Sequence, residues 1–177
     1  VFSLSAFPEK LLVVGGGYIA CEFSSIFNGF GSSVTQFCRS DTILRGFDIE
    51  ATSLVATQMK SNGIDLQFGV NVIKIEKEKN GFQVNDSFGR DQYFDQILFA
   101  TGRTPNSKEL QIGSAGLKFG INDEVLVDKY SKSSISSIYA IGDLTNRKQL
   151  TPVAIKEAMA FVETCLLYTS DAADERH

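Results

Sequence analysis

The sequence has few of the residues that most often carry chemistry at an active site. Its only histidine is His177, the last residue, and its three cysteines, Cys21, Cys38 and Cys165, form no C-x-x-C pair. A zinc site or a redox couple written as a local cysteine motif is therefore excluded. We expect no catalytic residue and no metal ligand in this chain.

The sequence also lacks a basic surplus and a long hydrophobic run. Its 177 residues include 17 Lys and Arg against 21 Asp and Glu, a formal net charge of −4, so we expect no nucleic-acid partner. No apolar run approaches the roughly 20 residues that a membrane-spanning helix needs, so no membrane association is expected. Unpaired cysteines fit a reducing compartment, and we expect the cytoplasm.

The pattern near the start of the chain predicts a β-α-β unit. Leu11–Val14 is a short apolar run typical of a buried parallel strand, and residues 34–38 alternate like a second strand. Gly31 is expected to end the helix between them. Five apolar residues at helical spacing predict the buried face of that helix: Ile19, Phe23, Ile26, Phe27 and Phe30.

The next segment predicts more of the same domain. A helix is expected over residues 49–62, with Asp48 as its N-cap, followed by a strand at 64–68. Asn80-Gly81 is a strong hairpin signal, so an antiparallel meander should precede a last parallel strand at 96–100. The fold class expected is α/β, a Rossmann-like NAD(P)-binding domain with an inserted β-meander.

The pattern changes after residue 104, where we place a boundary between domains 1–104 and 105–164. Short strands are expected at 125–127 and 138–141, and a helix with Thr151 as N-cap and Pro152 as its first residue. Residues 165–175, C-L-L-Y-T-S-D-A-A-D-E, resemble a translated sequencing adapter. We therefore expect residues 165–177 to be a non-native tail.

A glycine motif lies between the first strand and helix, as Gly15-x-Gly17-x-x-Ala20. Gly15 permits a tight turn, Gly17 lets a pyrophosphate approach the backbone, and Ala20 lets helix and strand pack closely. The helix N-terminus supplies free N–H groups and a positive dipole. The motif predicts dinucleotide binding, and a glycine-rich turn without a ligand is the alternative.

The end of the second strand indicates which dinucleotide binds. A NAD site usually has Asp or Glu there, whereas this chain has Cys38 followed by Arg39 and later Arg45. Two arginines can pair with the 2′-phosphate of NADP. Hydrogen bonds to charged groups contribute about 1.5–3 kcal/mol each, enough to favour NADP over NAD. The alternative is two solvated surface arginines.

A second candidate site follows the strand expected at 138–141. Asp143 can accept hydrogen bonds from a polyol chain, and the helix that begins near Thr151 aims its amides at an electron-rich group. A reduced flavin carries negative charge that such a terminus stabilises. Each element is also common in proteins that bind no flavin.

With these residues in hand, the chain resembles the flavoprotein disulfide reductase family, and within it the glutathione reductase branch. The resemblance covers residues 8–164. Four segments match in the family's order: G-G-G-Y-I-A-C-E-F, R-S-D-T-I-L-R-G-F-D, A-T-G-R-T-P-N and I-Y-A-I-G-D-L-T-N-R-x-x-L-T-P-V-A-I.

The resemblance implies roles for residues at the glycine turn. Tyr18 would cover the flavin until nicotinamide displaces it, and Glu22 would lie near the nicotinamide carboxamide; otherwise these are a core aromatic and a first-turn helix acid. The remaining residues would bind NADPH through its pyrophosphate, ribose, 2′-phosphate or nearby backbone: Gly15, Gly16, Gly17, Ile19, Arg39, Arg45 and Gly102.

The resemblance implies that Asp143 and Thr151 hold FAD, so residues 105–164 would be part of an FAD-binding domain. Gln149 stands at a position near the nicotinamide where the family usually has an apolar residue, and we do not include it among the predicted binding residues. The implied reaction passes hydride from NADPH to FAD and then electrons through an active-site disulfide to glutathione disulfide.

The resemblance also implies that the chain is an internal fragment of a homodimeric enzyme. The redox-active cysteine pair and the first FAD motif would precede it, and a His-Glu pair would follow it. Trypanothione reductase is the alternative within the family, although the short stretch 28–33 favours the glutathione enzyme. Cys38-Arg39 disfavours dihydrolipoamide dehydrogenase. A non-catalytic nucleotide-binding module is the alternative outside the family.

Overall fold

The computed structural model describes residues 1, 4–107 and 115–167, which belong to two compact units. The first unit is Val1–Gly102 and the second is Arg103–His177. The division falls beside the boundary expected near residue 104. Residues 168–177, most of the expected non-native tail, lie outside the described residues.

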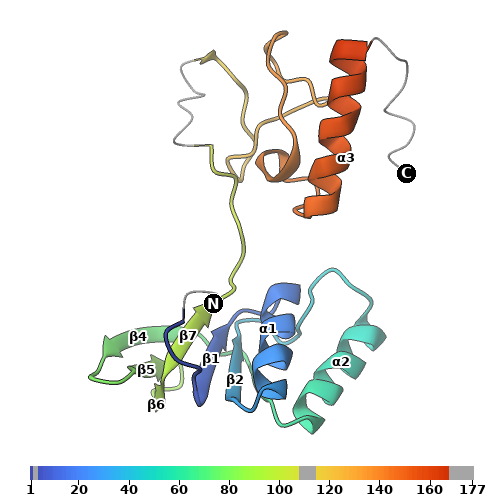
Figure 1. Cartoon of the computed structure of the whole chain (residues 1–177). Coiled ribbons are helices and arrows are strands. Elements are labelled where there is room, and N and C mark those ends of the chain that lie inside the picture. Colours follow the sequence, from blue (N-terminus) through green and yellow to red (C-terminus); the bar gives the residue numbers. More distant parts are fainter. Residues whose placement is uncertain (2–3, 108–114, 168–177) are drawn as a thin grey trace. The chain divides into compact units, whose positions relative to one another are not determined.

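A parallel sheet forms the centre of the first unit. Its strands are β1 (Lys10–Val14), β2 (Ser33–Cys38), β3 (Asp65–Phe68) and β7 (Gln96–Phe99), in the spatial order β3-β2-β1-β7. Helices α1 (Tyr18–Gly29) and α2 (Ile49–Ser61) cover one face of this sheet (Figure 1). The expected α/β fold with its β-α-β unit is confirmed.

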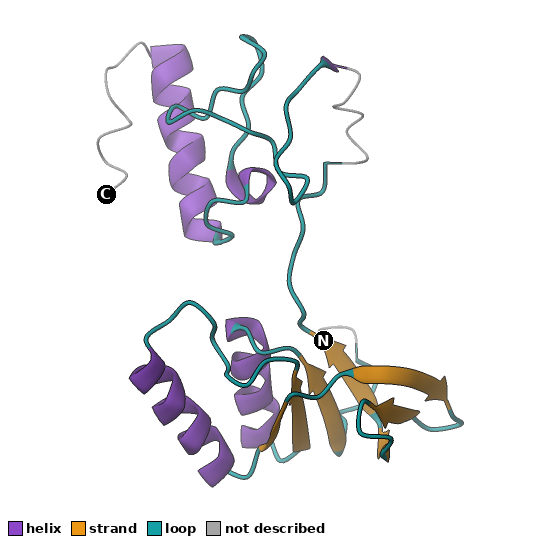
Figure 2. Cartoon of the chain, turned by 180° about the vertical axis from the view of Figure 1, so that it is seen from behind, coloured by secondary structure: helices purple, strands orange, loops and turns teal. Residues whose placement is uncertain are grey.

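The inserted meander packs on the other face of the parallel sheet. It consists of β4 (Val72–Lys77), β5 (Phe82–Asp86) and β6 (Asp91–Phe94), all antiparallel (Figure 2). Leu11 and Val13 of β1 pack with the helices, whereas Leu12 packs with Val84 and Phe94 of the meander.

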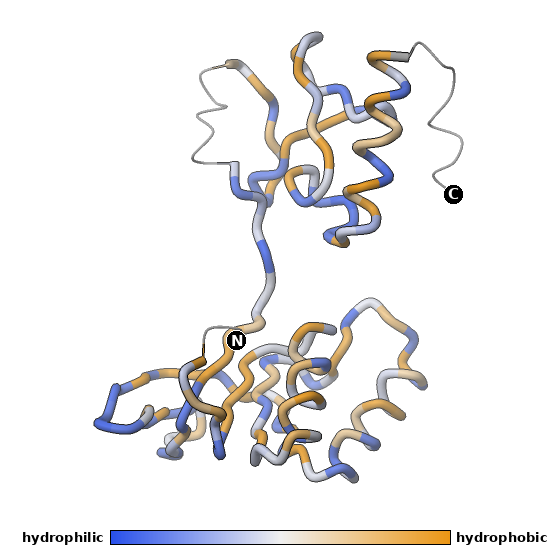
Figure 3. Tube along the Cα trace, in the orientation of Figure 1, coloured by the Kyte–Doolittle hydropathy of each residue, from blue (hydrophilic) through white to orange (hydrophobic). Residues whose placement is uncertain are grey.

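Because β1 is covered on both faces, its sequence is a continuous apolar run and does not alternate. Figure 3 shows the hydrophobic residues along the parallel strands and hydrophilic residues at the turn between β4 and β5.

The hairpin between β4 and β5 forms where Asn80-Gly81 predicts it, although Gly81 is not one of the two central residues of the turn. The Glu78 amide donates to the Gly81 carbonyl over 2.9 Å, so Lys79 and Asn80 occupy the turn. A Cβ on Gly81 would lie 2.5 Å from the Phe94 carbonyl oxygen. Glycine is therefore needed here because β6 passes close to it.

The N-cap and the end of α2 are confirmed. The Asp48 carboxylate accepts hydrogen bonds from the amides of Glu50 and Ala51, each 3.0 Å long. These bonds satisfy amides that have no acceptor within the helix. Gly63, just after the helix, has a φ of 94°, as expected of a glycine that ends one.

The buried face predicted for α1 is partly wrong. Ile26 and Phe30 are 48% and 75% exposed. Phe27 is buried as predicted, and the other buried residues of the helix are Ala20, Cys21 and Ser24. Small side chains at this face let the helix backbone approach the sheet closely, so the larger apolar side chains lie on its flank. Phe30 there makes an edge contact with Phe7.

The second unit contains α3 (Thr151–Val162), the short 3-10 helix η3 (Gly142–Thr145) and a π-helical turn, η4 (Glu163–Leu167). The strands expected at 125–127 and 138–141 are wrong, because these segments form only single bridge pairs. Asp123 and Ser131, with φ angles of 63° and 64°, lie in the turns that connect the residues of two of these pairs.

The start of α3 also differs from the expectation. Thr151 is the first helical residue and Leu150 the N-cap, which makes no side-chain capping bond. Pro152 follows Thr151, where its missing N–H costs the helix nothing. In the described part of the chain, no helix has the length and apolar composition needed to cross a membrane.

One buried carboxylate makes stability depend on pH. Asp86 accepts hydrogen bonds from the amides of Phe88 and Arg90 and pairs with the Arg90 guanidinium at 2.7 Å. Burial raises the pKa of Asp86, but hydrogen bonds from the Arg90 side chain and from both amides outweigh it, so that the pKa lies below its usual value. The stabilisation is complete above the unfolded-state pKa of about 3.9 and is lost as the pH falls through the lower folded-state pKa.

We predict that Asp86→Asn is less stable than the native chain at pH 7 and loses less stability on acidification. Urea unfolding followed between pH 7 and pH 3 measures both effects. Asp91→Asn is the control, because Asp91 is exposed and accepts one hydrogen bond, from Asn85. Equal pH dependence in Asp86→Asn and the native chain would contradict the prediction.

Candidate functional site

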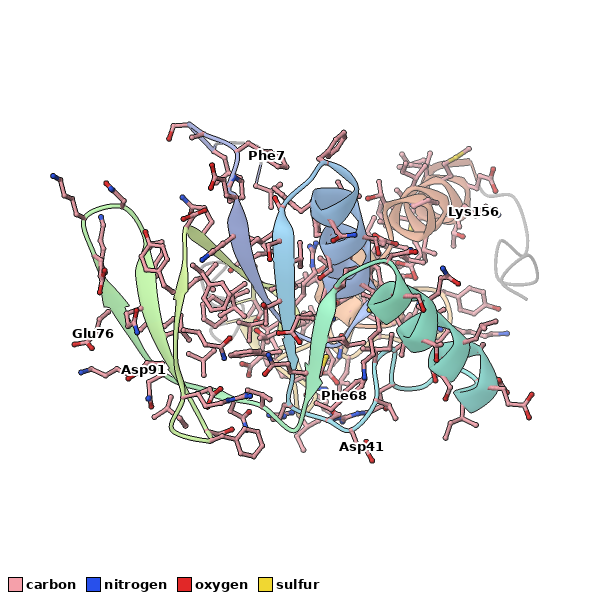
Figure 4. The ribbon with its side chains drawn as sticks, turned by 90° about the horizontal axis from the view of Figure 1, so that it is seen from below. Phe7, Asp41, Phe68, Glu76, Asp91 and Lys156 are labelled. Carbon is pink, nitrogen blue, oxygen red and sulfur yellow. The ribbon has the colours of Figure 1, made fainter. Side chains whose placement is uncertain are left out.

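The carboxyl ends of the parallel strands meet at one edge of the sheet, where Figure 4 labels Asp41 after β2 and Phe68 at the end of β3. The glycine turn follows β1 at this edge. Gly15 has a φ of 143°, and a Cβ on it would lie 2.3 Å from the carbonyl oxygen of Ala100, just after β7. No other residue fits at position 15, because its neighbour is rigid backbone.

Gly17 meets different surroundings, since a Cβ there would have no atom within 4 Å. Gly17 is the N-cap of α1, and among the described residues no side chain caps the amides of the first turn. Those amides have no acceptor within the helix, and the helix dipole adds positive potential. Open space above uncapped amides is the arrangement that binds a phosphate.

Hydrogen bonds fix the peptide groups of the turn. The Gly15 amide donates to the Phe37 carbonyl (2.9 Å), and the Gly15 carbonyl accepts from Gln36 Nε2 (3.0 Å) and from the Cys38 thiol (3.4 Å). The Gly16 carbonyl accepts from the amide of Leu44 (2.6 Å). Gln36 was not identified from the sequence; the available signal was a polar residue at the alternate positions that Val34 and Cys38 also occupy.

The hydrogen bond from Leu44 joins a second segment to the glycine turn. This segment is residues 39–47, which we call the arginine loop. Arg39 and Arg45 are both exposed, and in the described chain neither forms an ion pair. Arg45 Nη2 donates to the Ser40 hydroxyl over 2.7 Å, which brings the two ends of the loop together. The arginine loop, which is joined to the glycine turn, therefore carries two positive charges that are not paired with a carboxylate of the described residues.

The other predicted residues of the first unit have these positions. Tyr18, the first residue of α1, is 41% exposed and so is not a core aromatic, and Ile19 is half-buried. Glu22 is exposed and lies beyond the first turn of α1, which has no acidic residue, so its description as a first-turn acid is wrong. Gly102 is exposed with a φ of 133°.

In the second unit, Asp143 follows Gly142, and Thr151 begins α3, the helix against which Gly142 packs. Gly142 has a φ of 64°, and a Cβ on it would lie 3.1 Å from Ala154 Cβ on α3. Asp143 forms an ion pair with Arg103 at 2.5 Å, and Thr151 is exposed at the helix start. The structure thus places a partly exposed carboxylate on a turn that packs on the first turns of α3.

Two residues that hold this turn were missed from the sequence. The buried Glu157 of α3 accepts a hydrogen bond from the Gly142 amide (2.7 Å) and pairs with Arg147 at 3.4 Å. Arg147 also donates to the carbonyl of Asp128. An acid on an otherwise small and apolar helix face was the only signal, and it does not identify the partner.

A parallel sheet with a glycine turn and an uncapped helix N-terminus at its carboxyl edge defines a dinucleotide-binding α/β protein. The sequence model of the pyridine nucleotide-disulphide oxidoreductase family matches residues 1–158. The chain belongs to that family, and the resemblance to flavoprotein disulfide reductases is confirmed.

Several relatives are similar to most of the chain. A glutathione reductase of Burkholderia cepacia is 43% identical over 93% of this chain and 36% of its own length, and a trypanothione reductase of Leishmania donovani is 46% identical over 92% and 34%. The structure of the HOCl-induced flavoprotein disulfide reductase RclA from Escherichia coli matches with a TM-score of 0.89 and 29% identity, over 98% of this chain and 40% of that one. The chain thus spans about a third of the length of its curated relatives.

We predict opposite outcomes for alanine at the two ends of the glycine turn. Gly15→Ala places its Cβ against the Ala100 carbonyl and should destabilise the chain by more than about 4 kcal/mol, because the backbone must move. Gly17→Ala enters open space and should change stability by less than about 1 kcal/mol. Thermal unfolding of both variants measures this, and a Gly15→Ala variant with native stability would contradict it.

Proposed function

We propose that this chain is part of an NADPH-dependent, FAD-containing disulfide reductase, with the first unit binding NADPH. The hydrogen bond from the Leu44 amide to the Gly16 carbonyl carries the proposal, because it fixes the arginine loop beside the phosphate-binding turn. A dinucleotide with its pyrophosphate at the turn then has its adenosine ribose near Arg39 and Arg45. The role of each residue stays a prediction.

Charge supports NADPH over NADH at this site. Position 38, at the end of β2, is a cysteine and not the carboxylate that bonds a free ribose 2′-hydroxyl. Guanidinium groups form strong charge-assisted bonds with phosphate. Gly15, Gly16, Gly17 and Ile19 would then contact the pyrophosphate and ribose, and the exposed Tyr18 and Glu22 the nicotinamide half, with Gly102 near the same nucleotide.

The second unit supports a separate site for FAD. Its turn, held by Glu157, presents the Asp143 carboxylate, which can accept hydrogen bonds from a ribityl chain. Thr151 begins a helix whose first amides lack a side-chain cap. When bound, FAD would supply the redox chemistry, and this chain's residues would bind and orient it.

We propose glutathione disulfide as the substrate of the whole enzyme, which would act as a homodimer. Only three residues, Phe30 to Ser32, separate α1 from β2, which supports this branch because trypanothione reductases often have an insertion there. Trypanothione reductase remains the second candidate, since the relative from Leishmania donovani is 46% identical.

We propose the cytoplasm as the compartment of the enzyme. Cys21, Cys38 and Cys165 are free thiols, which fits a reducing environment. A relative from Pisum sativum, 44% identical, is named as a chloroplastic or mitochondrial glutathione reductase, so the compartment differs among relatives.

We predict that Arg39→Ala and Arg45→Ala each weaken NADPH binding by about 10- to 100-fold, the loss of one hydrogen bond to a charged group. NADH binding should change less than twofold, because NADH carries no 2′-phosphate. Isothermal titration of the 177-residue chain with both nucleotides measures the two constants.

Lys77→Ala is the matched control for these variants, because it removes an exposed positive charge at the end of β4, in the meander. It should leave both dissociation constants unchanged. A parallel loss of NADH binding in the arginine variants, or no loss of NADPH binding, would contradict the assignment of the arginine loop.

We also predict that the 177-residue chain by itself does not reduce glutathione disulfide with NADPH. Its three cysteines are too far apart in sequence to form the family's C-x-x-x-x-C pair. Absorbance of NADPH at 340 nm, followed with FAD and glutathione disulfide present, tests this. Steady NADPH consumption that requires the disulfide would refute the prediction, whereas a chain that binds no dinucleotide at all would refute the proposed function.

A further inference from the structure

The floor of the glycine turn holds a polar cluster that the proposed function does not use. Gln36 and Cys38 of β2 are 0% and 1% exposed, on the face of the sheet that α1 covers. Gln36 Nε2 lies 3.8 Å from the sulfur atoms of both Cys21 and Cys38. An amide thus lies within an otherwise apolar core, directly beneath the turn.

Core stability does not account for Gln36. Its Oε1 atom is buried and, among the described residues, has no hydrogen-bond partner. A buried amide oxygen without a partner destabilises the folded state, whereas leucine would fill a similar volume without that penalty. The one strong interaction of this side chain is the 3.0 Å hydrogen bond from Nε2 to the Gly15 carbonyl.

That hydrogen bond also sets the direction of the Gly16 N–H, which belongs to the same peptide group as the Gly15 carbonyl. The chain contains no cis peptide bond in its described part, so the carbonyl of Gly15 and the N–H of Gly16 point in opposite directions. Because Gln36 and Cys38 bind the carbonyl from below, the Gly16 N–H points away from the core. Leu44 fixes the next plane in the same way, through the Gly16 carbonyl.

Backbone N–H groups that face open space can bind an anion. The Gly16 amide faces away from the core, and the space beside Gly17, the next residue, is open. The Cys38 thiol supports this arrangement as a donor, since burial, with a smaller contribution from Cys21, raises the pKa of Cys38 to about 11. The thiol therefore keeps its proton at neutral pH.

We propose that Gln36, assisted by Cys38, is a positioning residue that aims the amides of the glycine turn at the pyrophosphate of the bound dinucleotide. The inference rests on the proposed function and adds to it. Pyrophosphate is common to NADPH and NADH, whereas the 2′-phosphate is bound by the arginine loop. Loss of Gln36 should therefore weaken the binding of NADPH and of NADH equally, whereas loss of Arg39 or Arg45 should weaken mainly the binding of NADPH.

The test compares Gln36→Leu with the native 177-residue chain by titration with NADPH, NADH and 2′-AMP. We expect NADPH and NADH to bind about five- to tenfold more weakly, the effect of one lost hydrogen bond. Binding of 2′-AMP, which has the 2′-phosphate but no pyrophosphate, should not change. The thermal midpoint should stay the same or rise, because the unpaired Oε1 is removed.

Two cysteine variants complete the test. Cys38→Val removes the second donor to the Gly15 carbonyl. It should weaken the binding of NADPH and NADH equally, by a smaller factor than Gln36→Leu does. Cys21→Val is the matched control: its sulfur lies as close to Gln36 as that of Cys38 but has no hydrogen bond to Gly15. It should leave the binding of all three ligands unchanged.

Three outcomes would overturn the inference while leaving the proposed function intact: native NADPH binding by Gln36→Leu, a loss of 2′-AMP binding of the same size, or failure of Gln36→Leu to fold. Each would show that Gln36 either does nothing for binding or serves the fold. A native chain that binds neither NADPH nor 2′-AMP would instead overturn the proposed function, and this inference with it.

Discussion

The contact between Gly15 and the Ala100 carbonyl is the constraint on which the first unit depends. Strand β7 comes last in the sheet and lies directly beside β1, and the Ala100 amide continues that ladder by donating to the Val14 carbonyl. The turn after β1 must then pass over Ala100 with no side chain between them. This close passage directs the chain into α1 and leaves the amides of the first turn facing open space.

The same arrangement recurs in the second unit with different atoms. Gly142, whose φ of 64° is one that side chains rarely adopt, packs against a helix, and a buried polar side chain, Glu157, binds its peptide group. In the first unit, Gln36 does this for Gly15 through the carbonyl. Both turns lie at the candidate cofactor sites, so in each unit a buried polar residue orients backbone that a ligand would contact.

Burial on both faces of the central strand explains the composition of the first unit. The helices cover one face and the meander the other, so β1 contains no polar residue between Leu11 and Val14. The two exposed arginines of the arginine loop lie at the carboxyl edge, where a hydrogen bond joins that loop to the glycine turn. The scaffold is thus apolar and rigid, and its binding groups lie on segments that it positions.

The local patterns in the sequence were enough to predict the parallel strands, both helices of the first unit, the Asp48 cap and the glycine motif, because each depends on residues close together in the chain. The strands expected after residue 124 were wrong, since these segments form only single bridge pairs, and the pattern of a segment does not show how far a partner runs beside it. Likewise, helical periodicity identified an apolar face of α1 but not which part of it the sheet covers, because small residues decide that contact. Only the tertiary structure decided that Gly15 meets Ala100, that Leu44 fastens the arginine loop and that Gln36 and Glu157 hold the two turns, because these contacts join residues whose proximity arises from folding and not from sequence spacing.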